Sequence, residues 1–352
     1  MAPTTATKHP AQRTMPRMTE LTFVSGGNTL AGTLTLPAGD GPWPVVVLLH
    51  GAGWGTREYY GAFVDAFLAR GVGSFVFDRR GEGESTGSSE QDIFAFAVDA
   101  EAAWAAVRTQ PGVDSRQVGL WGYSNGAWVA ALAASRLPEC AFLVLTGASA
   151  VSPGEAEAYR RTEELRSQGI PEGTLAAVKR TWSIVFGYLA GQPWQPYWDV
   201  EMSGLAAVIN MDRRLMDLPV SELAKSNPGL DSVPRFDSAV FRSLRERGGA
   251  VPGMGFDPIP ALEQVGCPVL VVLAERDQNL PPAESARRFG EVANKRAAGE
   301  FAVTMFPGVG HEFSKEASSP GTLGLPMTAD EFVPDYLELM AAWVGALPAR
   351  RG

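Results

Sequence analysis

Continuous apolar runs alternate with helix-like stretches along most of this 352-residue chain, and that alternation limits the folds open to it. Runs of this kind are typical of strands buried on both faces of a sheet, and parallel strands need crossover helices between them. The sequence therefore predicts an α/β fold in which helices cover both faces of a parallel sheet. Glu20–Ser25 and Thr29–Leu36 are predicted to pair around a Gly26-Gly27-Asn28 turn, and the further predicted strands are Pro44–Leu49, Gly73–Phe77, Gln117–Trp121, Ala141–Thr146, Pro268–Ala274 and Phe301–Phe306. The predicted helices are Tyr59–Arg70, Asp92–Thr109, Ala127–Leu137, Glu155–Gly169, Thr174–Leu189 and Ala329–Leu347.

The alternation stops between residues 152 and 260, where charged helical pieces and turns with Pro and Trp replace the strand-like runs. We expect residues 152–260 to form a helical cap inserted into one sheet domain, which residues 20–151 and 261–352 build. Residues 1–19 are polar, contain several prolines and lack the apolar stretch of a secretory signal. They are expected to be a disordered leader.

Charge and composition exclude several classes of partner. The net charge of −9 argues against nucleic acid or an anionic membrane surface. No run approaches the roughly 18 apolar residues of a membrane-spanning helix, so a cytoplasmic protein is expected. Cys140 and Cys267 lie beside apolar runs and are expected to be small buried residues, not a disulfide or metal ligands. The oligomeric state stays open, and a homodimer is one alternative.

The pentapeptide Gly122-Tyr123-Ser124-Asn125-Gly126 lies between a predicted strand and a predicted helix. A serine on such a sharp turn stands above the sheet edge, where a base and a substrate can reach its hydroxyl. A second G-x-S-x-G, around Ser85, follows a polar loop with no strand leading into it. Ser124 is therefore predicted as a nucleophile, and Ser85 as part of a turn.

A serine hydroxyl is a weak nucleophile, so it needs a neighbouring base that a third group orients. The chain has three histidines. His9 lies in the predicted leader, His50 ends an early predicted strand, and His311 directly follows the last one. Because active groups in such sheets gather at the carboxyl ends of strands, His311 is predicted as the base by position and by elimination.

An acid between the serine and the histidine in chain order would fix the tautomer of the imidazole and stabilise its charged form. Asp277 follows the predicted strand Pro268–Ala274 and is the preferred candidate. Glu275 is the competing candidate and lies closer to the strand. The loop at residues 147–151 offers no acidic residue.

Acyl transfer places negative charge on the substrate carbonyl oxygen, which backbone N–H groups can stabilise. Asn125, the residue after the predicted nucleophile, supplies one such group. The small-residue loop His50-Gly51-Ala52-Gly53-Trp54 is expected to supply the other, from Ala52 or alternatively from Gly53. His50 is expected to brace this loop and not to act as a second base.

These features together resemble a serine hydrolase of the α/β-hydrolase superfamily. The resemblance runs from about Glu20 to the end of the chain, with the insertion as its least similar part. It rests on His50-Gly51, Asp78–Ser85, Gly122–Gly126, Asp277 and His311, in the expected order. The segment Asp78–Ser85 resembles the D-x-R-G-x-G-x-S loop of many such enzymes, where it is mainly structural.

The likeness is greatest to the esterase, thioesterase and peptidase-like branch with a helical cap. It implies a mostly parallel sheet of about eight strands, no cofactor or metal, and a small-molecule acyl substrate. The expected activity is hydrolysis of a carboxylic ester or thioester through an acyl-serine. The same fold and residues would also serve cleavage of an amide or a carbon–carbon bond, or acyl transfer and cyclisation, and the sequence does not separate these.

Several aromatic residues are candidates for contact with substrate. Trp54, beside the small-residue loop, is expected to be the nearest. The aromatics of the cap either grip an acyl group or simply attach the cap to the sheet domain, and packing is favoured for any single one. They are Trp182, Phe186, Tyr188, Trp194, Tyr197 and Trp198. The pair Arg213-Arg214 and the basic cluster at residues 242–247 are expected to form solvated helix faces.

Overall fold

The computed structural model describes residues 15–53, 55–89, 92–210, 249–251, 253–316 and 328–348. Eight strands form a single sheet in the order β1-β2-β4-β3-β5-β6-β7-β8. Strand β2 is antiparallel to both of its neighbours, and the other pairs from β4 to β8 are parallel. The strands are β1 Arg17–Ser25, β2 Asn28–Leu36, β3 Trp43–Leu49, β4 Gly73–Phe77, β5 Val113–Tyr123, β6 Leu143–Thr146, β7 Val269–Ala274 and β8 Phe301–Phe306. This confirms the predicted α/β fold with a mostly parallel sheet.

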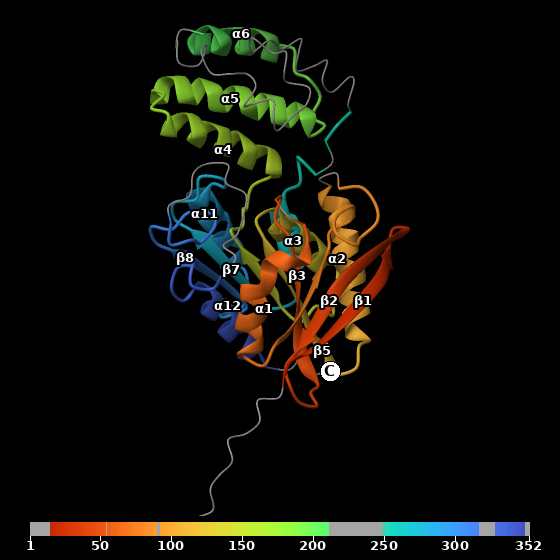
Figure 1. Cartoon of the computed structure of the whole chain (residues 1–352). Coiled ribbons are helices and arrows are strands. Elements are labelled where there is room, and N and C mark those ends of the chain that lie inside the picture. The colour runs from red at the N-terminus through yellow and green to blue at the C-terminus, as the bar shows by residue number, and fades with distance from the viewer. Residues whose placement is uncertain are drawn as a thin grey trace, which may run out of the picture.

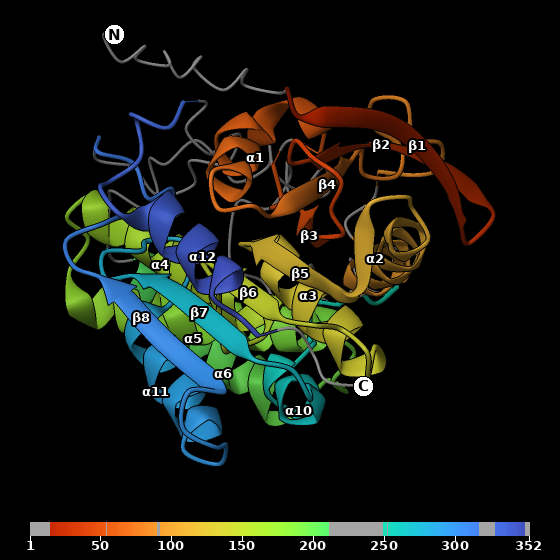
Figure 2. The same ribbon diagram turned by 90° about the horizontal axis from the view of Figure 1, so that it is seen from below.

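Helices cover both faces of the sheet (Figures 1 and 2). Helices α1 and α12 pack on one face, and α2, α3, α10 and α11 pack on the other. The strands serve both layers because successive side chains point to opposite faces: in β3, Val45 and Val47 join one apolar cluster, and Val46 joins the other. These helices are α1 Gly61–Leu68, α2 Ile93–Arg108, α3 Asn125–Arg136, α10 Pro258–Gln264, α11 Pro282–Ala293 and α12 Tyr336–Gly345, with a 3-10 turn η1 at Arg57–Tyr60.

Several boundaries differ from those predicted. Strand β1 begins at Arg17, so the last part of the predicted leader pairs with β2, while residues 1–14 lie outside the described residues. The last helix begins at Tyr336 and not near Ala329, because Asp335 has a left-handed backbone (φ 66°) that starts the helix there. Helix α11 was not predicted at all.

Three helices of the predicted cap region stack beyond the carboxyl ends of the strands (Figure 1). They are α4 Pro153–Ser167, α5 Glu172–Leu189 and α6 Tyr197–Asn210. Helix α4 begins with a capping box, in which the Ser152 hydroxyl accepts from the N–H of Glu155 and the Glu155 carboxylate accepts from the N–H of Ser152. Residues 211–248, with the basic residues noted above, lie outside the described part of the chain.

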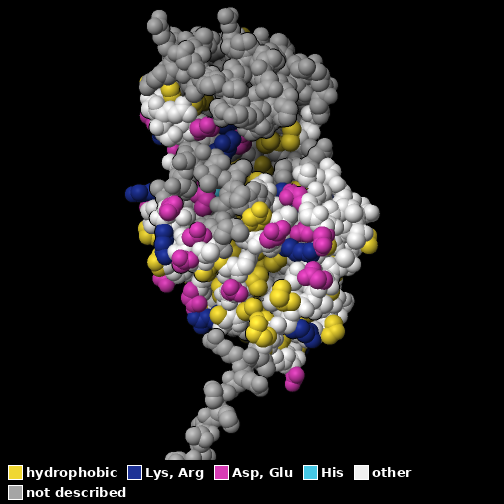
Figure 3. All heavy atoms as spheres, viewed as in Figure 1, with side chains coloured by type: hydrophobic (Ala, Val, Ile, Leu, Met, Phe, Trp, Pro, Cys, Tyr) yellow, Lys and Arg dark blue, Asp and Glu magenta, His cyan; other side chains and the backbone are white. Residues whose placement is uncertain are grey.

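The surface of the sheet domain carries charges of both signs. Acidic and basic side chains are intermixed on the face shown in Figure 3. Within the described ranges, no helix combines the length and the apolar character that a bilayer crossing requires.

The packing of α1 generates a test of the core. Phe63 is almost fully buried, and its ring lies 4.7 Å from that of Trp121 and 5.4 Å from that of Phe332, between ring centroids. Phe63→Ala should lower the free energy of unfolding by about 3–5 kcal/mol, measured by urea denaturation. Phe94→Ala, at a position that is 43% exposed, should cost less than about 1 kcal/mol. Equal losses would contradict this packing.

Candidate active site

Ser124 occupies a strained turn between β5 and α3. Its backbone has φ 53° and ψ −117°, a conformation that costs a non-glycine residue of order 1–3 kcal/mol. The Ser124 N–H donates to the carbonyl of Thr146 at the end of β6 (3.0 Å), and the Ser124 carbonyl accepts from the N–H of Ala127 (2.9 Å). Neighbouring structure therefore holds the turn from both sides, as predicted for a nucleophile elbow.

The two glycines of the pentapeptide permit close contact between backbones. A Cβ on Gly122 would lie 2.1 Å from the carbonyl oxygen of Gly126. A Cβ on Gly126 would lie 2.4 Å from the carbonyl oxygen of Leu49 and 2.6 Å from that of His50. The start of α3 is thereby pressed against the end of β3, which brings the loop after β3 to the serine.

The structure brings Ser124, His311 and Asp277 together in one chain of hydrogen bonds. The Ser124 hydroxyl lies 2.9 Å from Nε2 of His311, and Nδ1 of His311 lies 2.7 Å from Oδ2 of Asp277. All three side chains are more than nine-tenths buried. With Nδ1–H donating to the carboxylate, Nε2 is the acceptor for the serine proton.

Backbone groups fix the carboxylate of Asp277. Its Oδ1 accepts from the N–H groups of Asn279 and Leu280, both at 2.8 Å, which leaves Oδ2 for the imidazole. Glu275, the competing candidate, has a different role: its Oε2 accepts from the N–H of Gly308 (2.7 Å) and so holds the loop that leads to His311.

Two buried histidines next to the sheet have opposite pKa shifts. Burial alone would lower the pKa of His311, but the charge of Asp277, its hydrogen bond and the nearby charge of Glu312 outweigh burial and raise it above the usual value. Burial lowers the pKa of His50 to about 4, and its Nε2–H donates to the carbonyl of Phe77. At neutral pH, His50 is therefore uncharged, with its Nε2–H bonded to the end of β4, and its role in bracing the loop after β3 stays a prediction.

The predicted oxyanion donors lie on two different elements. Asn125 is the first residue of α3, so its N–H has no acceptor within the helix and lies at the positive end of the helix dipole. Ala52 and Gly53 lie in the bend after β3, and Ala52 is exposed. Gly51 lies against the elbow, since a Cβ there would be 2.9 Å from Cδ1 of Tyr123.

Ser85 belongs to a structural loop, as predicted. Its hydroxyl donates to the carbonyl of Asp78 (2.6 Å) and accepts from the N–H of Ala31 (3.0 Å). Trp54, predicted to contact substrate, lies outside the described residues. Aromatics of the predicted cap contact one another: within α5, Trp182 stacks on Phe186 with ring centroids 5.4 Å apart, and Trp194, between α5 and α6, meets Trp198 of α6 at 5.4 Å.

Other residues near the site were not predicted to contribute to it. The hydroxyl of Tyr159, on α4, donates to the backbone carbonyl of Asp277 (2.9 Å) and so joins the predicted cap region to the acid loop. Arg79 and Glu82 hold the loop after β3. These contacts join segments far apart in the chain. The sequence marked Asp78–Ser85 as a structural loop, but not its contact with the loop after β3.

Comparison with known proteins identifies the family. The model of a family described as the alpha/beta hydrolase family matches residues 46–320. The chain belongs to this family. The match covers most of the chain and includes each residue of the hydrogen-bonded set, so it agrees with the fold and with the order of the motifs.

Curated relatives of this alpha/beta hydrolase include enzymes named as esterases. It is 25% identical to Esterase FrsA of Enterobacter sp. (strain 638) over 256 residues, 64% of this chain and 60% of that protein. It is 34% identical to the quorum-quenching protein AidA of Acinetobacter baumannii over 109 residues, 30% of this chain and 36% of that protein. The chain thus spans less than two thirds of the length of either relative.

Solved structures share the fold at low identity. The complex of DcsB with its substrate analogue has a TM-score of 0.53 and 17% identity, with 94% of this chain and 98% of that chain covered. Est1E from Butyrivibrio proteoclasticus, with ferulic acid bound, has a TM-score of 0.50 and 16% identity, with 92% and 96% covered. This likeness concerns the fold alone.

The close approach at the elbow yields a stability prediction. Gly126→Ala should destabilise the hydrolase strongly and prevent the native turn, because the added methyl would meet two backbone carbonyls that cannot move independently. Gly290→Ala, within α11 and with open space around it, should instead stabilise the protein by up to about 1 kcal/mol. Thermal unfolding of the purified variants measures both, and a stable Gly126→Ala protein would contradict the geometry.

The opposite shifts of the histidines yield a titration experiment. In NMR spectra, the ring of His311 should titrate above the ordinary histidine pKa, and Asp277→Asn should lower that pKa because the stabilising charge is lost. His50 serves as the internal control, with its pKa of about 4 unchanged by the substitution. A His311 pKa that Asp277→Asn leaves unchanged would rule out the electrostatic coupling.

Proposed function

We propose that this alpha/beta hydrolase is a serine hydrolase that cleaves a carboxylic ester or thioester through an acyl-serine intermediate. The observation that carries the proposal is the unbroken hydrogen-bond chain from the Ser124 hydroxyl through His311 to Asp277. A neutral serine needs a base that is itself oriented and electrostatically supported, and this arrangement supplies both.

In the acylation half-reaction, Oγ of Ser124 attacks the substrate carbonyl carbon while Nε2 of His311 takes the hydroxyl proton. The imidazolium that results is stabilised by the carboxylate of Asp277. The tetrahedral intermediate then collapses, the bond to the leaving group breaks, and His311 returns the proton to the departing alkoxide or thiolate.

In the deacylation half-reaction, water takes the place of the leaving group. His311 accepts a proton from the water as the water oxygen attacks the acyl carbon. The second tetrahedral intermediate then collapses and releases the carboxylic acid, while His311 returns the proton to Ser124. His311 must accept a proton in each half-reaction, and its pKa, raised by Asp277, makes the neutral imidazole a stronger proton acceptor.

The negative charge that develops on the carbonyl oxygen would be stabilised by the backbone N–H groups of Asn125 and Ala52. The position of Asn125 at the start of α3 adds the helix dipole to that stabilisation. Helices α4, α5 and α6 would act as a cap, and the hydrogen bond from Tyr159 to the backbone of Asp277 supports their place beside the site. Trp54 stays a predicted substrate contact.

The esterases among the relatives favour ester over amide hydrolysis. Amide or carbon–carbon bond cleavage and acyl transfer would use the same groups. A panel of ester, thioester, peptide and diketone substrates separates these activities.

The role of Ser124 can be tested directly. Ser124→Ala should reduce hydrolysis of p-nitrophenyl acyl esters by a factor of about 10³ or more, since the nucleophile is lost. It should also abolish covalent labelling by a fluorophosphonate probe. In the wild type, mass spectrometry of the labelled peptide identifies the serine that carries the probe.

Ser85→Ala is the matched control. It removes the hydroxyl of the other G-x-S-x-G serine and two hydrogen bonds of a structural loop. Stability should fall while Ser124 is still labelled. Full activity in Ser124→Ala, or probe attached to Ser85, would refute the assignment.

A further inference from the structure

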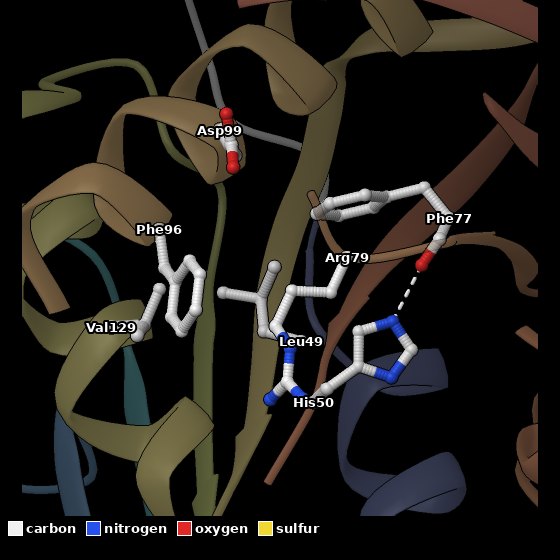
Figure 4. A pocket seen from close by; sticks show the side chains of 7 residues that line it. All are labelled: Leu49, His50, Phe77, Arg79, Phe96, Asp99 and Val129. Atoms are coloured by element: carbon white, nitrogen blue, oxygen red, sulfur yellow. Dashed lines mark hydrogen bonds between the residues drawn. The ribbon is translucent and has the colours of Figure 1, made fainter. Parts of the chain in front are cut away.

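The guanidinium of Arg79 holds the loop after β3 through two backbone carbonyls. Nη1 donates to the carbonyl of Gly51 and Nη2 to the carbonyl of Gly53, each at 2.9 Å. Arg79 is 5% exposed. Figure 4 shows its guanidinium in a pocket with Phe96 on one side and His50 on the other, and the Phe96 ring centroid lies 5.3 Å from the guanidinium carbon.

Glu82 completes the support. Its Oε1 accepts from Nε of Arg79 (3.0 Å), and its Oε2 accepts from the N–H of Gly55 (2.9 Å). The backbone N–H of Arg79 also donates to the carbonyl of Gly55 (2.7 Å). A Cβ on Gly55 would lie 2.7 Å from Nε of Arg79, so glycine is needed for this approach. The Arg79–Glu82 pair therefore holds the loop at Gly51, Gly53 and Gly55.

These contacts determine where one N–H group points. A trans peptide is planar, with its C=O and N–H on opposite sides. Because the carbonyl of Gly51 points to Arg79, the N–H of Ala52, in the same peptide, points away from Arg79. The loop adjoins the elbow, since Gly51 packs on Tyr123 and Gly126 packs on the end of β3.

We infer that Arg79 is a positioning residue that aims the N–H of Ala52 at the oxyanion of the acyl-transfer intermediate, with Glu82 orienting its guanidinium. This inference rests on the proposed function. It also favours Ala52 over Gly53 as the donor. The N–H of Gly53 shares its peptide with the carbonyl of Ala52, and Arg79 does not bind that carbonyl.

The adjacent arginine has a different task. Arg80 donates to both carboxylate oxygens of Asp99, each at 2.7 Å, and to the carbonyl of Ala95 (3.0 Å). It ties the Asp78–Ser85 loop to α2, and none of these contacts reaches the loop after β3. Two carbonyls and a carboxylate around Arg79 require the rigid planar fork of a guanidinium, which lysine cannot replace. Arg79 and Arg80 therefore form a matched pair for mutagenesis.

The experiment compares Arg79→Lys and Arg79→Met with the wild type in the full chain. The readouts are kcat and KM for p-nitrophenyl acetate and the inhibition constant of a trifluoromethyl ketone, whose adduct with Ser124 carries an oxyanion. Removal of one oxyanion donor typically lowers kcat by about 10²–10³, so misdirecting it should lower kcat by about 10- to 100-fold. Binding of the ketone should weaken by a similar factor, with KM changed less than about threefold.

Arg80→Lys is the control. It should lower the thermal stability while leaving kcat and ketone binding near those of the wild type. Glu82→Gln should give a smaller loss of the same kind as Arg79→Lys, and these two variants carry the test if Arg79→Met does not fold.

The outcomes are distinguishable. Wild-type kcat and ketone affinity in a folded Arg79→Lys protein would overturn the inference while leaving the proposed function in place. Losses in Arg80→Lys equal to those in Arg79→Lys would also overturn it, because the effect would then be one of stability. Absence of Ser124-dependent hydrolysis and of ketone binding in the wild type would overturn the proposed function and the inference with it.

Discussion

The contact between the start of α3 and the end of β3 determines the geometry of the whole site. Gly126 allows these two backbones to approach more closely than any side chain would permit, and Gly122, at the end of β5, allows the same close approach to Gly126. Ser124 adopts a positive φ in the turn beside this contact, and the hydrogen bond to Thr146 contributes to holding it there. Backbone strain of order 1–3 kcal/mol at one residue persists only where the surrounding structure leaves that residue no other conformation.

The sheet order then brings the other groups to this turn. Strands β5, β6, β7 and β8 are consecutive parallel neighbours, so the loops after them leave one edge side by side. Ser124 follows β5, Asp277 follows β7 and His311 follows β8, and the short β6 supplies the carbonyl that holds Ser124. Ser124 therefore meets Asp277 and His311, each more than 150 positions away, because of the order of the strands in the sheet.

The features that could be predicted are those with a strong local signal. The buried strands could be predicted because apolar runs such as β7 are continuous. The structure also brings Ser124, Asp277 and His311 together, as predicted. Helix α11 was missed although the sequence carried a signal for it: Pro282 stands at its start, and the buried residues Ser285, Phe289 and Val292 recur at the spacing of one helix face. The start of β1 was missed because its first residues are exposed and lack apolar alternation.

Contacts between segments far apart in the chain cannot be predicted from local sequence patterns. Tyr159 and Asp277 are 118 positions apart, yet a single hydrogen bond links them. That bond goes to the backbone of the acid loop, whereas the carboxylate itself is held by Asn279 and Leu280 within the loop. The carboxylate geometry is thus set locally and does not depend on α4. It follows that the sequence and length of the helices above the sheet can change while the hydrogen bonds that hold the carboxylate stay the same.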